Sequence, residues 1–141
     1  MRLLILLVAI MSVMSGCKAK NTDSTIIQTP PVVQNLDTLP TQTDIDIATV
    51  RKMMNNSKGI VLLDVRTKEE VDAGKIENAL NIDFNKQDFA TQIEKLDKNK
   101  PYIVYCAVGG RSSKAASYMK ANGFHNVYNM LGGYNQWVEI K

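Results

Sequence analysis

The sequence predicts an α/β domain with a largely parallel central sheet flanked by short helices. Two observations lead to this fold class: apolar runs of strand length alternate with short segments of helical periodicity, and turn-forming residues separate them. The composition agrees, because 141 residues that are 45% hydrophobic and 22% charged suit one globular domain. The formal net charge of +3 comes without a Lys/Arg cluster, so we expect no nucleic-acid partner.

The first half of the domain is expected to hold three strands and two helices. Residues 44–56 combine a short strand with a helix that has apolar residues on one face. Residues 59–65 form a continuous apolar run, which is typical of a strand buried on both faces of a parallel sheet. A capping-box pattern, Thr followed three residues later by Glu, predicts a short helix in residues 67–74. A short strand is expected in residues 78–82.

The second half is expected to hold two strands and three helical segments. Residues 87–97 have apolar side chains at helical spacing, and residues 101–106 are a second buried strand. Residues 112–123 read as a helix that ends at a glycine. A strand in residues 126–130 and a last helical turn in residues 132–141 complete the fold.

Cys106 gives the strongest functional signal, because it directly follows a buried strand and ligands of such sheets bind beyond the carboxyl ends of the strands. Gly109 and Gly110 allow a tight turn in which successive N–H groups face one point. The next helix, expected to begin near Ser112, adds unpaired N–H groups and the positive end of its dipole, and Arg111 adds a full charge. These features favour a thiolate, the nucleophilic form of cysteine. The alternative is a small buried apolar residue at the end of a strand.

The N-terminus resembles a bacterial lipoprotein signal. Arg2 precedes an apolar stretch in residues 3–13, which is too short to span a bilayer, and small residues lead to Cys17. We expect residues 1–16 to be a signal peptide and Cys17 to carry lipid. The lipid would anchor the protein to a cell-envelope membrane, facing the periplasm or the cell exterior. Met14 departs from the usual leucine, and an ordinary cleaved signal or an uncleaved anchor is the alternative.

Residues 17–43 are expected to be the lipidated cysteine and a flexible tether, since the segment is rich in Thr, Gln and Asn and holds three of the four prolines. Residues 44–141 are expected to form the folded domain. If Cys17 carries lipid, Cys106 has no partner for an internal disulfide. A lone cysteine in an exported protein is either buried and inert or reactive.

Four segments in order resemble a single rhodanese-type sulfurtransferase domain, over about two-thirds of the chain. They are LLDVRTKEE (62–70), GKIENALNI (74–82), YIVYCAVGGRSSKAA (102–116) and NVYNMLGGYNQW (126–137). The resemblance implies a persulfide relay: Cys106 would take the outer sulfur of a sulfane donor and pass it to a thiol or cyanide, with a protein acceptor as a further option. Arg111 would attract an anionic donor and stabilise charge on the leaving group. The sulfur anions would be held by backbone N–H groups of Ala107, Val108, Gly109, Gly110 and Ser112.

The resemblance implies neither a cofactor nor a metal, and it gives Asp64 and Arg66 a structural role beneath the loop. Two departures from the family pattern stand out. Lys75 replaces a usual histidine, and Glu77-Asn78 replaces a frequent Pro-Gly, which puts the conformation of that turn in doubt. The uncharged side chains of the loop leave donor selection to Arg111 and the backbone, so thiosulfate is expected to be a poor donor.

Three other functions stay open. A cysteine-dependent phosphatase or arsenate reductase cradles an oxyanion in a similar loop, although only four residues separate Cys106 from Arg111, against five in tyrosine phosphatases. A membrane-tethered module without catalysis is the second, but such members typically lack the cysteine. A sulfur or redox carrier for one protein partner is the third. The only histidine, His125, is expected to be an exposed turn residue and not a general base.

Overall fold

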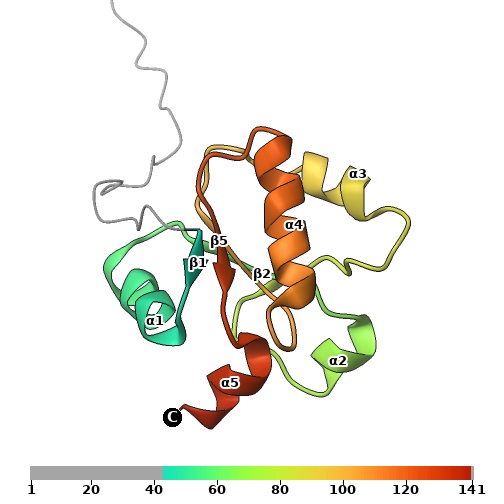
Figure 1. Ribbon diagram of the computed structural model, residues 1–141. Helices are drawn as coiled ribbons and strands as arrows, with labels where there is room; N and C mark the ends of the chain where they lie inside the picture. Colours follow the sequence, from blue (N-terminus) through green and yellow to red (C-terminus); the bar gives the residue numbers. More distant parts are fainter. Residues whose placement is uncertain (1–42, 141) are drawn as a thin grey trace, which may run out of the picture.

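Five parallel strands form the centre of the domain, in the order β1-β5-β4-β2-β3, in a computed structural model that describes residues 43–140. Figure 1 shows the domain, with β1, β2 and β5 labelled among the strands. The strands are β1 (Asp44–Ile45), β2 (Val61–Asp64), β3 (Leu80–Asn81), β4 (Tyr102–Tyr105) and β5 (Val127–Met130). The helices are α1 (Ile47–Asn56), α2 (Lys68–Asp72), α3 (Phe89–Glu94), α4 (Gly110–Ala121) and α5 (Gly133–Glu139). The predicted fold class is confirmed. The predictions for the signal peptide, Cys17 and the tether up to residue 42 lie outside the described residues.

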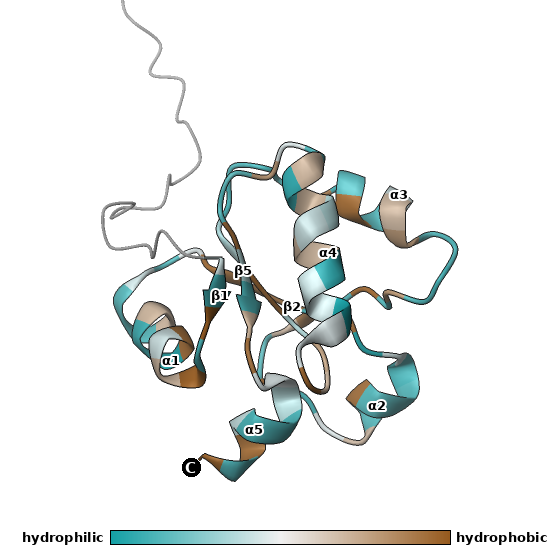
Figure 2. Cartoon of the chain, viewed as in Figure 1, coloured by the Kyte–Doolittle hydropathy of each residue, from teal (hydrophilic) through white to brown (hydrophobic). Residues whose placement is uncertain are grey.

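The sheet is covered on both faces, as the continuous apolar runs predicted. Along β4, Tyr102 and Val104 pack into one apolar cluster, together with residues of α3 and α4. Ile103 and Tyr105 pack into a second cluster, together with residues of α1. Figure 2 shows brown, hydrophobic residues along β2, whereas the β1 and β5 arrows also carry teal, hydrophilic residues. Cys106 continues the alternation of β4 and therefore faces α4.

The strand order places Cys106 at a topological switch point of the sheet. β2 and β4 are neighbours, but the chain leaves them in opposite directions, toward β3 from one and toward β5 from the other. In open α/β sheets, ligands bind beyond the carboxyl ends of the strands at such a switch point. The segments that follow β2 and β4 contain Arg66 and Cys106.

Every predicted helix and strand is present among the described residues, with boundaries that differ from the predicted ones by up to three residues. The helix expected to begin near Ser112 begins at Gly110, because Gly109 adopts a φ of 104° and serves as the N-cap. This earlier start brings the Ser112 side chain into the first turn of α4. No helix within residues 43–140 is long and apolar enough to cross a membrane.

The turn at Glu77-Asn78 contains one residue in the left-handed backbone conformation. Asn78 has a φ of 61°, a conformation that glycine adopts freely and asparagine tolerates better than most residues. Asparagine therefore supplies at this turn the conformation for which Pro-Gly would use its glycine. The capping box at the start of α2 is confirmed, with the Thr67 and Glu70 side chains each accepting from the other's backbone N–H.

Candidate active site

The sulfur of Cys106 lies inside the loop that connects β4 to α4. Cys106 is buried, with 1% of its surface exposed. The Gly109 N–H donates to the Sγ atom at 3.1 Å, and the Ser112 Oγ lies 3.6 Å from the same atom. The residue is buried as a packing cysteine would be, yet its sulfur contacts hydrogen-bond donors that packing alone does not require.

Two opposing effects act on the Cys106 thiol. Burial acts to raise its pKa, but hydrogen bonds to the sulfur outweigh burial and hold the pKa below its ordinary value. The donors are the hydroxyl and N–H groups of Ser112 and the N–H groups of Val108 and Gly109. The arrangement favours the thiolate, which is the nucleophilic form.

The first turn of α5 fixes the other side of the loop. The Tyr134 N–H donates to the Cys106 carbonyl at 2.8 Å, and the Asn135 N–H donates to the Ala107 carbonyl at 3.1 Å. A trans peptide unit points its N–H opposite to its C=O, so the Val108 N–H is directed away from α5 and toward the sulfur. α5 thus holds the loop in the conformation that presents its amides to Cys106.

Gly133 makes this close approach possible. Its φ is 57°, and a Cβ at this position would lie 2.6 Å from the Ala107 carbonyl oxygen and would also collide with the Cys106 carbonyl oxygen. Gly133 was not predicted to lie beside the cysteine. The double glycine after the last strand was the available signal, because a glycine pair marks a close backbone approach as well as a turn.

Ser112 is held beside the sulfur by a chain of buried polar groups. Its hydroxyl lies 2.6 Å from the Asn129 Oδ1 and 3.0 Å from the Gly109 carbonyl oxygen. The Asn129 Nδ2 donates to the Asp44 carboxylate at 2.9 Å, which fixes which end of the amide faces Ser112. The single hydroxyl hydrogen of Ser112 therefore has three acceptors within reach: the Asn129 Oδ1, the Gly109 carbonyl oxygen and the Cys106 sulfur.

Arg111 is not a free cation at the mouth of the loop. Its Nη1 and Nη2 donate to the two carboxylate oxygens of Glu70 at 2.7 and 2.6 Å, the bidentate geometry that is strongest for this pair. The Arg111 guanidinium lowers the pKa of Glu70 to about 2. Glu70 raises the pKa of Arg111, and Cys106 contributes to the same effect more weakly, so the guanidinium acts on both groups.

Glu70 was not a predicted site residue. The sequence assigned it only to the capping box of a short helix, where it serves as expected. Its pairing with Arg111 joins positions 41 residues apart, across two elements. No local pattern carries that information.

Asp64 and Arg66 form a buried ion pair under α2. The Arg66 Nη2 lies 2.7 Å from the Asp64 carboxylate, and both side chains are at most 4% exposed. The guanidinium also donates to the carbonyls of Glu70 and Gly74, and it stacks 4.0 Å over the Tyr134 ring. Arg66 therefore positions α2, and with it the carboxylate that faces Arg111.

The remaining loop positions differ in their constraints. Gly109 requires its positive φ, whereas Gly110 has an ordinary φ and open space where a Cβ would point. Of the two glycines, Gly109 is therefore the one whose backbone conformation the turn requires. Val108 is 68% exposed and forms the outer tip of the loop. His125 is exposed in a bend before β5, as expected.

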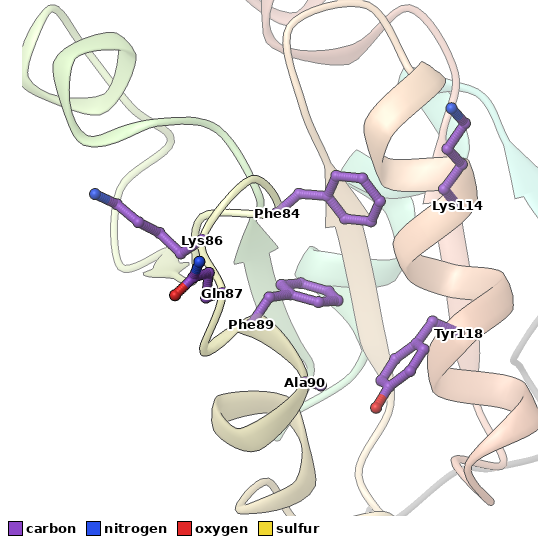
Figure 3. A pocket seen from close by; sticks show the side chains of 7 residues that line it. All are labelled: Phe84, Lys86, Gln87, Phe89, Ala90, Lys114 and Tyr118. Carbon is purple, nitrogen blue, oxygen red and sulfur yellow. The ribbon is translucent and has the colours of Figure 1, made fainter.

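A separate pocket of about 410 Å³ lies between α4 and the segment from Phe84 to Ala90 (Figure 3). The rings of Phe84, Phe89 and Tyr118 form its apolar wall, and Lys114 approaches from α4. The loop from Cys106 to Arg111 contributes nothing to its lining, so this pocket is not the environment of the thiol. Within residues 43–140, no group of three or more His, Cys, Asp or Glu side chains is placed to hold a metal ion.

Comparison with known proteins gives one consistent family. Residues 46–140 match the Rhodanese-like domain family. The chain is 37% identical over 81 residues to thiosulfate sulfurtransferase GlpE of Coxiella burnetii, a match that covers 57% of this chain and 73% of that protein. It is 38% identical over 85 residues to tRNA uridine(34) hydroxylase of Cytophaga hutchinsonii, covering 58% of this chain and only 27% of that longer protein.

Solved structures agree with the family match. A rhodanese-like domain protein from Staphylococcus aureus superimposes with a TM-score of 0.62 at 32% sequence identity. The superposition covers 68% of this chain and 91% of that one. The similarity therefore extends over nearly the whole of the compared chain.

Proposed function

Because the chain belongs to the rhodanese-like domain family, we propose that it is a sulfurtransferase that carries sulfur as a persulfide on Cys106. The observation that carries the proposal is the environment of the Sγ atom. It lies at the carboxyl end of a central strand, 3.1 Å from the Gly109 N–H, with its pKa held below the ordinary value by the loop and α4. The resemblance to thiosulfate sulfurtransferases supports the same chemistry.

The proposed cycle has two steps. In each step a nucleophile forms a bond to the transferred sulfur, and the S–S bond that held this sulfur breaks. In the first, the Cys106 thiolate attacks the outer sulfur of a sulfane donor, and the donor leaves with the electrons of its broken S–S bond. With thiosulfate, the products are Cys–S–S⁻ and sulfite. In the second, cyanide or a thiolate attacks the outer persulfide sulfur, which regenerates the Cys106 thiolate and releases thiocyanate or a new persulfide.

The loop amides have a defined task in this cycle. Charge moves from Sγ to the outer sulfur when the persulfide forms, and fixed N–H groups stabilise both positions without reorganising. The N–H groups of Val108 and Gly109 and both donors of Ser112 surround the inner sulfur. The other N–H groups of the loop and the Arg111 guanidinium are available to the outer sulfur of the persulfide.

Intact-mass spectrometry after incubation with a sulfane donor tests the proposal. We expect the full chain to gain one sulfur atom, and peptide mapping to place it on Cys106 and not on Cys17. Cys106→Ala should gain none at this position, while Cys17→Ala should behave like the wild type. No adduct on Cys106 with thiosulfate, a polysulfide or a thiol persulfide would contradict the proposal. Hydrolysis of an aryl phosphate that depends on Cys106 would favour the phosphatase instead.

We also propose that the chain is exported and anchored by lipid on Cys17. The support is the sequence pattern alone: one basic residue, an apolar stretch of eleven residues, then small residues before a cysteine. Mass spectrometry of the protein from its membrane fraction should find an N-terminal Cys17 carrying acyl chains. An unmodified Cys17 in that sample would refute the anchor and leave the sulfurtransferase proposal untouched.

A further inference from the structure

The arginine beside the active-site loop is paired with a carboxylate. Among the residues that the structure describes, three side-chain ion pairs are present, and two of them lie at this site. Asp64 and Arg66 neutralise each other beneath α2, and Glu70 neutralises Arg111 at the loop. An approaching donor therefore meets amide groups and a paired guanidinium, not an unpaired cation.

The pair at the loop is held firmly in place. The Glu70 carboxylate accepts from the Thr67 N–H at 3.0 Å as well as from Arg111, so the capping box fixes its direction. The Glu70 carbonyl accepts from Arg66, which anchors the backbone of α2. Neither Glu70 nor Arg111 is fully accessible, with 33% and 26% of their side chains exposed. Two hydrogen bonds of the Arg111 fork are thus committed before any donor binds.

We propose that Glu70 is a specificity-determining residue that selects sulfur donors of low negative charge and disfavours the thiosulfate dianion. The proposal rests on the sulfurtransferase function proposed above. A dianion that approaches the Cys106 thiolate is repelled by it and also by the Glu70 carboxylate, while Arg111 is already paired with that carboxylate. A donor with one charge or none meets less repulsion, and a thiol persulfide belongs to this class.

Thiosulfate and methanethiosulfonate have the same reacting group but different charges. Comparing them therefore separates the effect of donor charge from the effect of donor reactivity. Thiosulfate transfers its outer sulfur to the Cys106 thiolate and leaves as sulfite, carrying two negative charges. Methanethiosulfonate transfers its outer sulfur in the same way and leaves as methanesulfinate, carrying one. Each reaction forms one S–S bond at Cys106, breaks one S–S bond in the donor and needs no further oxidant or reductant.

The test compares kcat/KM for these two donors in the wild type and in Glu70→Gln. Glutamine keeps the size of the side chain and an oxygen that can accept from Thr67 and Arg111, but it removes the charge. We expect kcat/KM for thiosulfate to rise about ten-fold, mainly through KM, and the value for methanethiosulfonate to rise clearly less. In Glu70→Gln with Arg111→Gln, the gain for thiosulfate should disappear.

Glu69→Gln is the matched control. Glu69 is the neighbouring first-turn residue of α2 and is exposed, so its substitution removes the same charge without touching Arg111. The ratio of the two kcat/KM values in this variant should stay that of the wild type. An unchanged ratio in Glu70→Gln, or equal changes in both variants, would overturn the inference.

A binding measurement separates this inference from the function on which it rests. Sulfate, an unreactive dianion, should protect Cys106 of Glu70→Gln from alkylation at about ten-fold lower concentration than in the wild type. If wild-type Cys106 gains sulfur but neither the donor ratio nor the protection changes, the inference alone is wrong. If wild-type Cys106 gains no sulfur from either donor, the proposed function fails and the inference fails with it.

Discussion

The position of α5 against the active-site loop makes Gly133→Ala the most informative substitution in this protein. The added methyl group would lie 2.6 Å from the Ala107 carbonyl oxygen, and the backbone at Gly133 has a φ of 57°. Carbonyl groups of the loop cannot yield as the end of a flexible side chain can. We therefore expect α5 to move away from the loop, or the loop to move away from α5.

The cost follows from what that displacement breaks. The hydrogen bonds from Tyr134 N–H and Asn135 N–H to the loop carbonyls each contribute about 1 kcal/mol. A left-handed alanine costs about 1–2 kcal/mol more than glycine, while the reduced freedom of the unfolded chain offsets up to about 1 kcal/mol. The free energy of unfolding should fall by about 3 kcal/mol. The Val108 N–H should also turn away from the sulfur. Persulfide formation on Cys106 should therefore slow even under conditions in which the variant stays folded.

Gly110→Ala is the control for this experiment, because the same change is made at the other end of the loop. Gly110 has open space at its Cβ position and begins α4, so alanine should change stability by no more than about 1 kcal/mol, in the stabilising direction. Urea unfolding and intact-mass measurement of the persulfide would be made on both variants. If Gly133→Ala is as stable as Gly110→Ala, or takes up sulfur as readily, α5 does not hold the loop in its active conformation.

Three further predictions concern Ser112, Glu70 and Arg66. Ser112→Ala should raise the pKa of the Cys106 thiol, since the hydroxyl is a donor to the sulfur; the ultraviolet absorbance of the thiolate against pH measures this, and an unchanged or lower pKa would refute it. The pKa of Glu70 is lowered from 4.5 to about 2, so the stability it contributes is present above about pH 4.5 and is lost as pH falls toward 2. With allowance for solvent screening, Glu70→Gln should remove about 1 kcal/mol or less of that acid dependence, and parallel stability curves for wild type and variant between these pH values would contradict the pairing. Arg66→Met should cost about 3–5 kcal/mol because it leaves the Asp64 carboxylate buried without its partner. Lys68→Met, which breaks an exposed pair with Asp72, should cost about 1 kcal/mol or less in the same urea titration, and equal losses would argue against the buried pair as the cause.

The amino-acid sequence was sufficient for the α/β architecture and for the position of the thiol. Burial on both faces of a parallel sheet leaves continuous apolar runs such as residues 59–65 and 101–106, and these are readable without any contact information. Capping residues and glycines act within a few positions of themselves, so the N-cap of α2 at Thr67 and the turn at Gly109 are local properties as well. The place of Cys106 between such a strand and such a turn follows directly.

Tertiary structure alone decided which distant residues support the loop around the sulfur. Glu70, Asn129 and Gly133 reach the loop from α2, β5 and α5, and their distances from it along the chain bear no relation to their distances in space. The charge of Arg111 is the clearest example. The sequence presents Arg111 as a free cation beside a nucleophile, whereas the fold places a carboxylate 2.6 Å from its guanidinium. Secondary structure is set by neighbours along the chain, but an ion pair is set by which side chains the packed sheet and helices bring within reach.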